Sequence, residues 1–446
     1  MPKPPLSPVP EQEADVGGRL SGSQSPSEVV PSGGAASGAS AGLSTWAVEP
    51  QAEQGESSTS CTEHEEDGST GDSAEDENGE EQWDTDLEIE ESRKSYDPAG
   101  KAKYLDTCQT YGVVPISYFV RHMKDSELTL THHGLSPKAA KAVALSLTNN
   151  TSVAKLNLSD NGLGGEGTAA IAEMMMENCF ISDLDLSENR SGLKGAIALS
   201  AMLRTNTTLM TLKLSGNELK DDAAKHVAEA LVYNNKVASL DLSGNMLGEA
   251  AGEVLGAAIA ENVGLKELDL SWNYFRGQGA VAIAKGLGSH EQKRSSMWSM
   301  PKANIFLRVL DLSYNGFGNS GAAALGEALK VNNVLEELHV GNNRISLEGA
   351  LGLGLGLKEN KALKSLCVPR NPIPSEGCTG ILKALRANPG TVLEFLDFSE
   401  VVMNQEFVGF CAAVQDVFPS LQIKHDGTSR SFRTDPAKGS REDPEL

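Results

Sequence analysis

Apolar and polar residues alternate along most of this chain in a pattern that repeats every 28 residues. Each period opens with apolar residues at the spacing LxxLxLxxNxL, as in the segment VAKLNLSDNGL. The alternation in its LxL core predicts a short strand with one buried face, ended by a turn at the asparagine. Eight units carry this asparagine, and together they form a ladder of equivalent positions: Asn161, Asn189, Asn217, Asn245, Asn273, Asn315, Asn343 and Asn371.

The second part of each period predicts an α-helix. In one unit Gly167, Ile171 and Met175 follow one another at intervals of four residues, which places them on one helical face. A second asparagine, Asn178 in this unit, comes three residues later, and the other units repeat the same columns. Each unit is therefore predicted to contain a strand, an asparagine turn, a helix and a second asparagine turn.

Such units cannot bury their own apolar faces, so they must stack on one another. The pattern is typical of leucine-rich repeats, and it predicts a right-handed α/β solenoid, or horseshoe, with a concave parallel sheet and convex helices. We expect the asparagine amides to hydrogen-bond backbone groups of neighbouring turns. The stretch GLGLGL, centred near Gly354, falls inside a predicted helix and indicates close helix packing rather than a phosphate-binding loop.

The ends of the periodic region predict caps, because the terminal units of a solenoid expose apolar faces. We place the repeats at 128–400, between a helical cap at 93–127 and a C-terminal cap at 401–424. Segments 1–92 and 425–446 are predicted to be disordered, since they cannot bury enough apolar surface to offset the entropy of ordering. The residues expected to face the repeats are Tyr104, Leu105, Val114, Ile116, Phe119 and Met123 in the first cap and Phe407, Phe410, Val414 and Phe418 in the second.

Charge is distributed unevenly along the chain. The net charge is −23, and residues 1–92 contribute −20 of it through 22 acidic and two basic residues. The nearly neutral remainder offers no basic surface for nucleic acid, and no apolar run of ~18 residues predicts a membrane span. The lack of an apolar leader and of a disulfide-like cysteine spacing predicts a cytoplasmic protein, with a nuclear location left open.

No catalytic or metal-binding motif is present. The sequence lacks HExxH, GxSxG, GxxxxGK[ST] and EF-hand patterns, and His133 occupies the asparagine slot of the first repeat, where a structural role is expected. We therefore predict a non-enzymatic protein that uses no cofactor and no metal.

The strand positions that face away from the core form a candidate binding surface. One column holds four aspartates, and the turns beside it hold three aromatic residues, a combination suited to a protein partner that presents Lys or Arg. A structural explanation stays open, because aspartate at this position is common in this repeat class and the aromatic rings can pack on neighbouring units. The candidate residues are Asp185, Asp241, Asp269 and Asp311 with Trp272, Tyr274 and Tyr314.

An insertion of 14 residues interrupts the period after Leu287, and Asn304 restores it. The segment 288–303 is therefore predicted to loop out where a helix returns to a strand, leaving the solenoid intact. Insertions in repeat proteins often bind partners, but long surface insertions also cost little thermodynamically, so a tolerated or isoform-specific loop is the alternative explanation. Its candidate contact residues are Lys293, Arg294, Met297 and Trp298.

The 28-residue unit with a full helix resembles the ribonuclease-inhibitor-like class of leucine-rich repeat proteins. The segments YLDTCQTYGVVPISYFVRHM and LDLSWNYFRGQGAVAIAKGL are similar to the leucine-rich repeat-containing protein 74 group. The resemblance implies a scaffold that binds a protein partner on its concave face, and we expect a monomer.

Two alternatives come from the same resemblance and from the charge distribution. The class includes the Ran GTPase-activating protein, which implies GTPase activation through a turn arginine such as Arg344 or Arg190. Alternatively, the acidic segment 1–92 folds over the body and inhibits partner binding.

Overall fold

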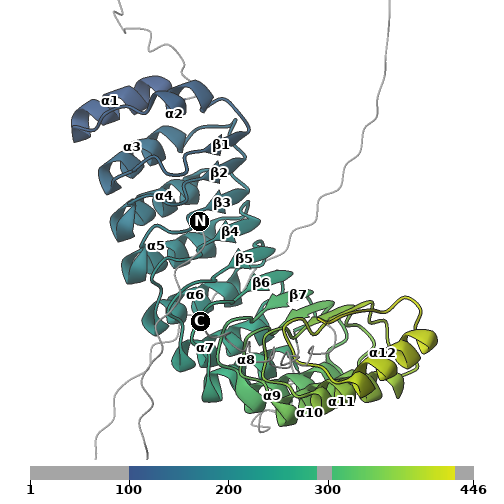
Figure 1. The fold of residues 1–446 in the computed structure, drawn as a ribbon. Coiled ribbons are helices and arrows are strands. Elements are labelled where there is room, and N and C mark those ends of the chain that lie inside the picture. Colours follow the sequence, from purple (N-terminus) through teal and green to yellow (C-terminus); the bar gives the residue numbers. More distant parts are fainter. Residues whose placement is uncertain (1–99, 289–303, 427–446) are drawn as a thin grey trace, which may run out of the picture. The chain divides into compact units, whose positions relative to one another are not determined.

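The computed structural model describes residues 100–288 and 304–426. Within them, eleven strands form one parallel sheet whose spatial order is the sequence order, and helices lie along one side of it (Figure 1). The predicted leucine-rich repeat solenoid is confirmed. Residues Lys293, Arg294, Met297 and Trp298 lie outside the described residues, as do segment 1–92 and most of 425–446.

The strands are three residues long in every described unit. They are β1 Glu127–Thr129, β2 Lys155–Asn157, β3 Asp183–Asp185, β4 Thr211–Lys213, β5 Ser239–Asp241, β6 Glu267–Asp269, β7 Val309–Asp311, β8 Glu337–His339, β9 Ser365–Cys367, β10 Phe395–Asp397 and β11 Gln422–Lys424.

The helices connect these strands and pack on the opposite side. They are α1 Lys101–Tyr111, α2 Ser117–His122, α3 Pro137–Leu147, α4 Gly164–Glu177, α5 Gly192–Thr205, α6 Asp221–Tyr233, α7 Glu249–Glu261, α8 Gly277–Leu287, α9 Gly318–Val331, α10 Leu347–Leu357, α11 Ser375–Arg386 and α12 Gln405–Val417.

The middle residue of each strand points into the core. Leu156 and Leu184, for example, are paired across β2 and β3 and are both buried, and Ile171 and Met175 of α4 are buried on the helix side. Neighbouring strands lie about 4.8 Å apart, whereas packed helices need 8–10 Å, so the helix side of the stack must follow a longer arc than the strand side. The sheet therefore presents the inner face of the solenoid.

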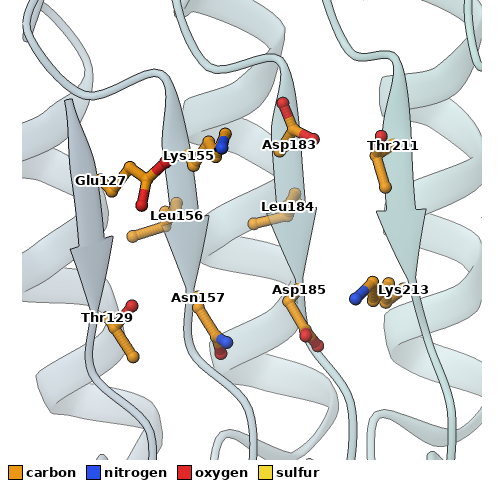
Figure 2. Close-up of a pocket in the computed structure, with 10 residues that line it drawn as sticks. All are labelled: Glu127, Thr129, Lys155, Leu156, Asn157, Asp183, Leu184, Asp185, Thr211 and Lys213. Atoms are coloured by element: carbon orange, nitrogen blue, oxygen red, sulfur yellow. Dashed lines mark hydrogen bonds and ion pairs between the residues drawn. The ribbon is translucent and has the colours of Figure 1, made fainter.

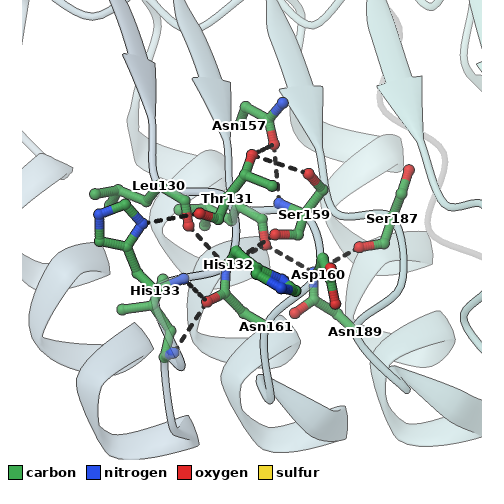
Figure 3. Close-up of polar contacts among 12 residues, drawn as sticks. Leu130, Thr131, His132, His133, Asn157, Ser159, Asp160, Asn161, Ser187 and Asn189 are labelled. Atoms are coloured by element: carbon green, nitrogen blue, oxygen red, sulfur yellow. Dashed lines mark hydrogen bonds and ion pairs between the residues drawn. The ribbon is translucent and has the colours of Figure 1, made fainter. Parts of the chain in front are cut away.

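The ladder asparagines hold the turns that follow the strands. Asn161 donates from Nδ2 to the carbonyl oxygens of Leu130 and Leu158, at 2.8 and 2.9 Å (Figure 3). Its Oδ1 accepts the backbone N–H groups of His133 and Leu135, both at 3.0 Å. One amide thus pairs backbone groups of two successive turns, which confirms the predicted role of the ladder.

The second asparagine column also pairs backbone groups of neighbouring turns, at the points where helices return to strands. Asn262 donates to the carbonyl oxygens of Leu231 and Asn234 and accepts the N–H groups of Gly264 and Leu265. Most side chains of both columns are buried, and their amide groups are hydrogen-bonded. Burial of a polar group costs free energy unless its hydrogen bonds are made.

The insertion does not disturb this framework. Asn304 donates to the carbonyl oxygen of Ile259 at 2.7 Å, as its counterparts do one unit apart, although 45 residues separate the two. The strands on either side still pair in register, with Leu268 opposite Leu310. The repeat register is therefore the same in the described residues before and after this segment.

Glycines allow helices α9 and α10 to approach each other closely. A methyl group on Gly326 of α9 would overlap the carbonyl oxygen of Gly352 of α10, and one on Gly356 would overlap the carbonyl oxygen of Gly326. The predicted packing role of GLGLGL is confirmed.

The first cap differs from the prediction at two residues. Tyr104, Phe119 and Met123 are buried as expected, but Leu105 is 40% exposed and Val114 is 86% exposed, so their predicted inward orientation was wrong. Helix α1 turns Tyr104 inward, and the next residue along a helix points about 100° away. Val114 lies in the non-helical connection between α1 and α2, where helical periodicity does not apply.

The second cap follows the prediction more closely. Phe407 and Val414 are buried, and Phe410 and Phe418 are half-buried against the core. The chain then adds β11, which pairs with β10 and was not predicted, because its segment lacks the leucine-asparagine pattern of the repeats.

Candidate protein-binding surface

Three of the predicted aspartates lie side by side at the centre of the sheet. Asp241, Asp269 and Asp311 end strands β5, β6 and β7 and are direct partners across the parallel ladder. The Oδ1 atom of each accepts the backbone N–H of the serine two residues later, at 2.8, 2.8 and 2.7 Å. Each carboxylate therefore has a structural hydrogen bond, but an amide oxygen can make the same bond, as Asn157 does with Ser159.

The charge on these aspartates is poorly compensated. Burial raises the pKa of the Asp269 carboxyl group above its ordinary value, and the carboxylates of Asp311 and Asp241 raise it further against the hydrogen bonds from Ser271. Among residues 100–288 and 304–426, no basic side chain forms an ion pair with any of the three aspartates. The three carboxylates are thus held in no ion pair by the described residues, and the nearest basic ladder positions are Lys213 beside Asp241 and His339 beside Asp311.

The fourth predicted aspartate belongs to a different region. Asp185 on β3 is separated from Asp241 by Lys213 on β4, so the acidic column is interrupted. Asp185 and Lys213 instead line a hollow of about 210 Å³ over β1–β4, together with Lys155 and Asp183 (Figure 2). Charges of both signs alternate there, and Lys155 is already paired with Glu127 at 2.6 Å.

The predicted aromatic residues do not form one cluster. Trp272 and Tyr314 stack face to face, with ring centroids 3.9 Å apart and planes 7° from parallel. Both occupy the turn position just before a ladder asparagine, with a left-handed backbone at φ 54° and 57°. Tyr274, which is 48% exposed, follows the ladder asparagine, and no ring contact joins it to the other two within the described residues.

An arginine that the sequence did not single out completes this stack. The guanidinium group of Arg370 hydrogen-bonds the hydroxyl of Tyr314 and lies 5.9 Å from its ring centroid. It also pairs with the carboxylate of Glu400 at 2.6 Å. Because Arg370 and Glu400 occupy the same turn position as Tyr314, a comparison of that column across all units could have found them.

The turn arginines considered for GTPase activation differ from each other. Arg190 lies 3.8 Å from Glu218, whereas Arg344 is exposed and is not paired with an acidic side chain of the described chain. Nothing in this geometry tests GTPase activation, which stays a prediction. His133 is exposed, and its Nδ1 lies 2.9 Å from the carbonyl oxygen of Thr131, in keeping with a structural role (Figure 3).

A metal site, a membrane span and a reactive thiol each place specific requirements on the described residues. They contain no group of three His, Cys, Asp or Glu side chains that could hold a metal ion, and none of their helices is long and apolar enough to cross a membrane. Cys108, Cys179, Cys367, Cys378 and Cys411 are free thiols. Burial raises the pKa of Cys367 to about 11 and that of Cys378 to about 12, so neither thiol is activated.

A family model described as Leucine Rich repeat matches residues 149–172, 205–228, 262–284, 303–326 and 331–354. These matches coincide with units whose strand, asparagine turn and helix are described above. The chain contains leucine-rich repeats.

Similar curated proteins belong to the same class. This leucine-rich repeat protein is 48% identical over 73 residues to leucine-rich repeat-containing protein 74B of Homo sapiens, covering 16% of the chain and 19% of the relative. It is 45% identical over 52 residues to the Mus musculus protein of that name, covering 12% and 13%. The matched segments span less than a fifth of either relative.

One similar solved structure is the Leiomodin-1 Actin-Binding Site 2 (ABS2). It is 18% identical to this leucine-rich repeat protein, with a TM-score of 0.30, and covers 37% of this chain and 88% of that one.

Proposed function

We propose that this protein is a non-enzymatic scaffold that binds a basic segment of a protein partner at the centre of its inner face. The contact surface is formed by Asp241, Asp269, Asp311, Trp272 and Tyr314, named here the central surface. Leucine-rich repeat proteins commonly mediate protein–protein interactions, so the proposal adds a place and a partner chemistry to the general role of the class.

The observation that carries the proposal is the placement of Asp269 between Asp241 and Asp311 on adjacent strands. Burial first, and then these two carboxylates, raise the pKa of Asp269. Holding three acidic side chains on adjacent strands, about 4.8 Å apart, costs stability unless a positive charge compensates them. Acidic groups with a perturbed pKa are candidates for functional sites. A Lys or Arg of the partner would supply the missing charge.

The aromatic pair beside the aspartates supports the same conclusion. Trp272 is 40% exposed although its ring is held flat against Tyr314. Rigid, partly exposed Trp and Tyr side chains are enriched among the residues that dominate binding energy. The surface therefore combines charge for attraction with a preorganised apolar area for contact.

The experiment compares capture of cellular proteins by the full chain and by the triple variant Asp241→Asn, Asp269→Asn, Asp311→Asn. Asparagine keeps the oxygen that accepts the serine N–H and removes only the charge, so the fold should persist. Asp185→Asn is the matched control, because it changes the same position in the neighbouring region.

We expect at least one protein that the wild type and the control retain and that the triple variant loses by about tenfold or more. Its binding should weaken with added salt and should map to a Lys- or Arg-containing segment. Retention of the same proteins by all three forms would show that the central surface is not the binding site.

A further inference from the structure

The described chain ends at the edge of the sheet where the strand-end aspartates stand. In the parallel register, Lys424 of β11 lies opposite Asp397 of β10. The same register runs back through β9 and β8 to Asp311 on β7. The carboxylate of Asp426, the last described residue, accepts the backbone N–H of Glu400 in the turn after β10. The chain that follows therefore leaves the sheet beside the column that contains Asp311.

In this column a lysine of the chain already binds an aspartate. The ammonium group of Lys424 lies 3.1 Å from Oδ2 of Asp397, and both residues end their strands. Asp241, Asp269 and Asp311 end β5, β6 and β7 in the same way, and none of the described residues forms an ion pair with them. Lys424 therefore shows that the inner face holds a cation against a carboxylate at this position.

The sequence just after the described residues is basic. Residues 427–434, GTSRSFRT, contain Arg430 and Arg433 and no acidic residue, and Phe432 lies between the two arginines. Residues 435–446 differ, because they contain four acidic and two basic residues. The part of the chain nearest to β11 thus has the positive charge that complements the aspartates of the central surface.

The length of this segment matches the distance to the central surface. Asp311 lies four strands before β11, about 19 Å away, and Asp269 lies five strands before it, about 24 Å away. Arg433 follows Asp426 by seven residues, which an extended chain spans in about 24 Å. Arg430 follows by four residues, or about 14 Å, and its side chain extends over the remaining distance to Asp311.

We propose that segment 429–434 of this chain binds its own central surface, with Arg430 at Asp311 and Arg433 at Asp269, so that a partner must displace it. The inference rests on the proposed function, and it names a competing ligand within the same chain. The two arginines then supply to β7 and β6 the positive charge that Lys424 supplies to Asp397 on β10.

Tethering makes this competition strong although each contact is weak. A ligand on a short linker acts at a local concentration of a few millimolar. We expect the free segment to bind the surface with a dissociation constant of about 0.3 mM. At a local concentration of about 3 mM, the tethered segment would occupy the surface about nine-tenths of the time and would weaken an added ligand about tenfold.

The test uses the full chain and the peptide acetyl-Ser-Arg-Ser-Phe-Arg-Thr-amide as the added ligand. Binding is followed through the backbone amide resonances of Ser271 and Ser313, which donate to Asp269 and Asp311. We compare the wild type with the double variant Arg430→Gln, Arg433→Gln. The peptide should bind the double variant about tenfold more tightly, because the competing segment has lost its charge.

Lys438→Gln, Arg441→Gln is the matched control, since it removes the same charge from the part of the chain that also carries the acidic residues. This control should bind the peptide as weakly as the wild type. Without peptide, the resonances of Ser271 and Ser313 should move in the double variant and stay in place in the control.

Equal peptide affinity of the wild type and the double variant, or the same gain in the control, would overturn the inference. A difference that grows with protein concentration would mean that the segment binds a second copy, which also overturns docking within one chain. If the peptide still needs the three aspartates in either case, the central surface stands. If the triple variant Asp241→Asn, Asp269→Asn, Asp311→Asn binds the peptide as tightly as the double variant does, the proposed function itself fails.

Discussion

Asp269 and Asp397 occupy the same position in their repeats, yet their surroundings shift the pKa values of their carboxyl groups in opposite directions. Each ends a strand, and each accepts the N–H of the serine two residues later. Burial raises the pKa of Asp269, and two carboxylate neighbours raise it further. Burial also tends to raise the pKa of Asp397, but the hydrogen bond from the Ser399 N–H and the ammonium of Lys424, 3.1 Å away, outweigh it and lower the pKa.

The difference lies in the adjacent strand, not in the repeat itself. At the C-terminal end β11 supplies Lys424 opposite Asp397, so the carboxylate is neutralised within the chain. At the centre the adjacent strands supply Asp241 and Asp311, so a cation must come from elsewhere. Lys424 therefore shows inside this molecule what a partner's basic residue would do for Asp269.

The asparagine ladder supports both regions, and a substitution in it should cause the largest loss of stability. Asn245→Ala would leave three carbonyl oxygens and two backbone N–H groups without the amide that now pairs them. We expect the free energy of unfolding to fall by about 3 kcal/mol, measured by urea denaturation. The exposed Asn333→Ala is the control and should change it by less than about 0.5 kcal/mol. Equal effects would mean that the ladder is not the source of stability.

Substitution of Asp397 in the C-terminal region should cause the next largest loss of stability. Asp397→Ala removes the acceptor of the Ser399 N–H and the counter-charge of Lys424, and we expect a loss of about 2 kcal/mol at neutral pH. Because the folded pKa of Asp397 is lowered, the ionic part of its contribution is present above the ordinary pKa of aspartate and is lost as pH falls through the folded value. Asp397→Asn, which keeps the acceptor, should cost less at neutral pH and differ little from wild type in acid.

Substitution of Asp269 in the central region should have the smallest effect, and it should raise stability instead of lowering it. The folded pKa of Asp269 is raised, so its protonated form favours folding, and this contribution is lost as pH rises through the folded pKa. Asp269→Asn should therefore unfold at slightly higher urea concentration than wild type at pH 7, and the gain should shrink toward acid pH. A loss of stability at pH 7 would contradict the view that this carboxylate is held at a cost.

Much of the fold could be predicted from the sequence because the same residue pattern recurs in many units, and each recurrence strengthens the prediction. The columns that contain Asn161, Ile171 and Asn178 recur often enough to predict strands, helices and both asparagine turns, and even the register across the insertion. The prediction was wrong at Leu105 and Val114, where the chain is not repetitive and helix orientation depends on what the cap packs against. It also missed β11, whose residues carry no repeat signal.

The candidate site was predicted less completely. The aspartates and the aromatic residues were found from their columns, but their grouping was not. Lys213 separates Asp185 from the central surface, and Tyr274 has no ring contact with the Trp272–Tyr314 pair among the described residues. Arg370 and Glu400 stand in the same turn column as Tyr314, but their contacts with one another span separate units and could not be predicted from the column.

The sequence by itself determined which residues are equivalent from one repeat to the next, since a period of 28 residues places them on one backbone frame. Only the tertiary structure decided which of them meet. Long side chains such as Glu188 and Arg370 cross from one unit to another, and their direction depends on rotamers and on the space left by neighbours such as Gly216. The charge state of Asp269 likewise follows from what stands on β5 and β7, because electrostatic energy depends on distance in space and not on position in the repeat.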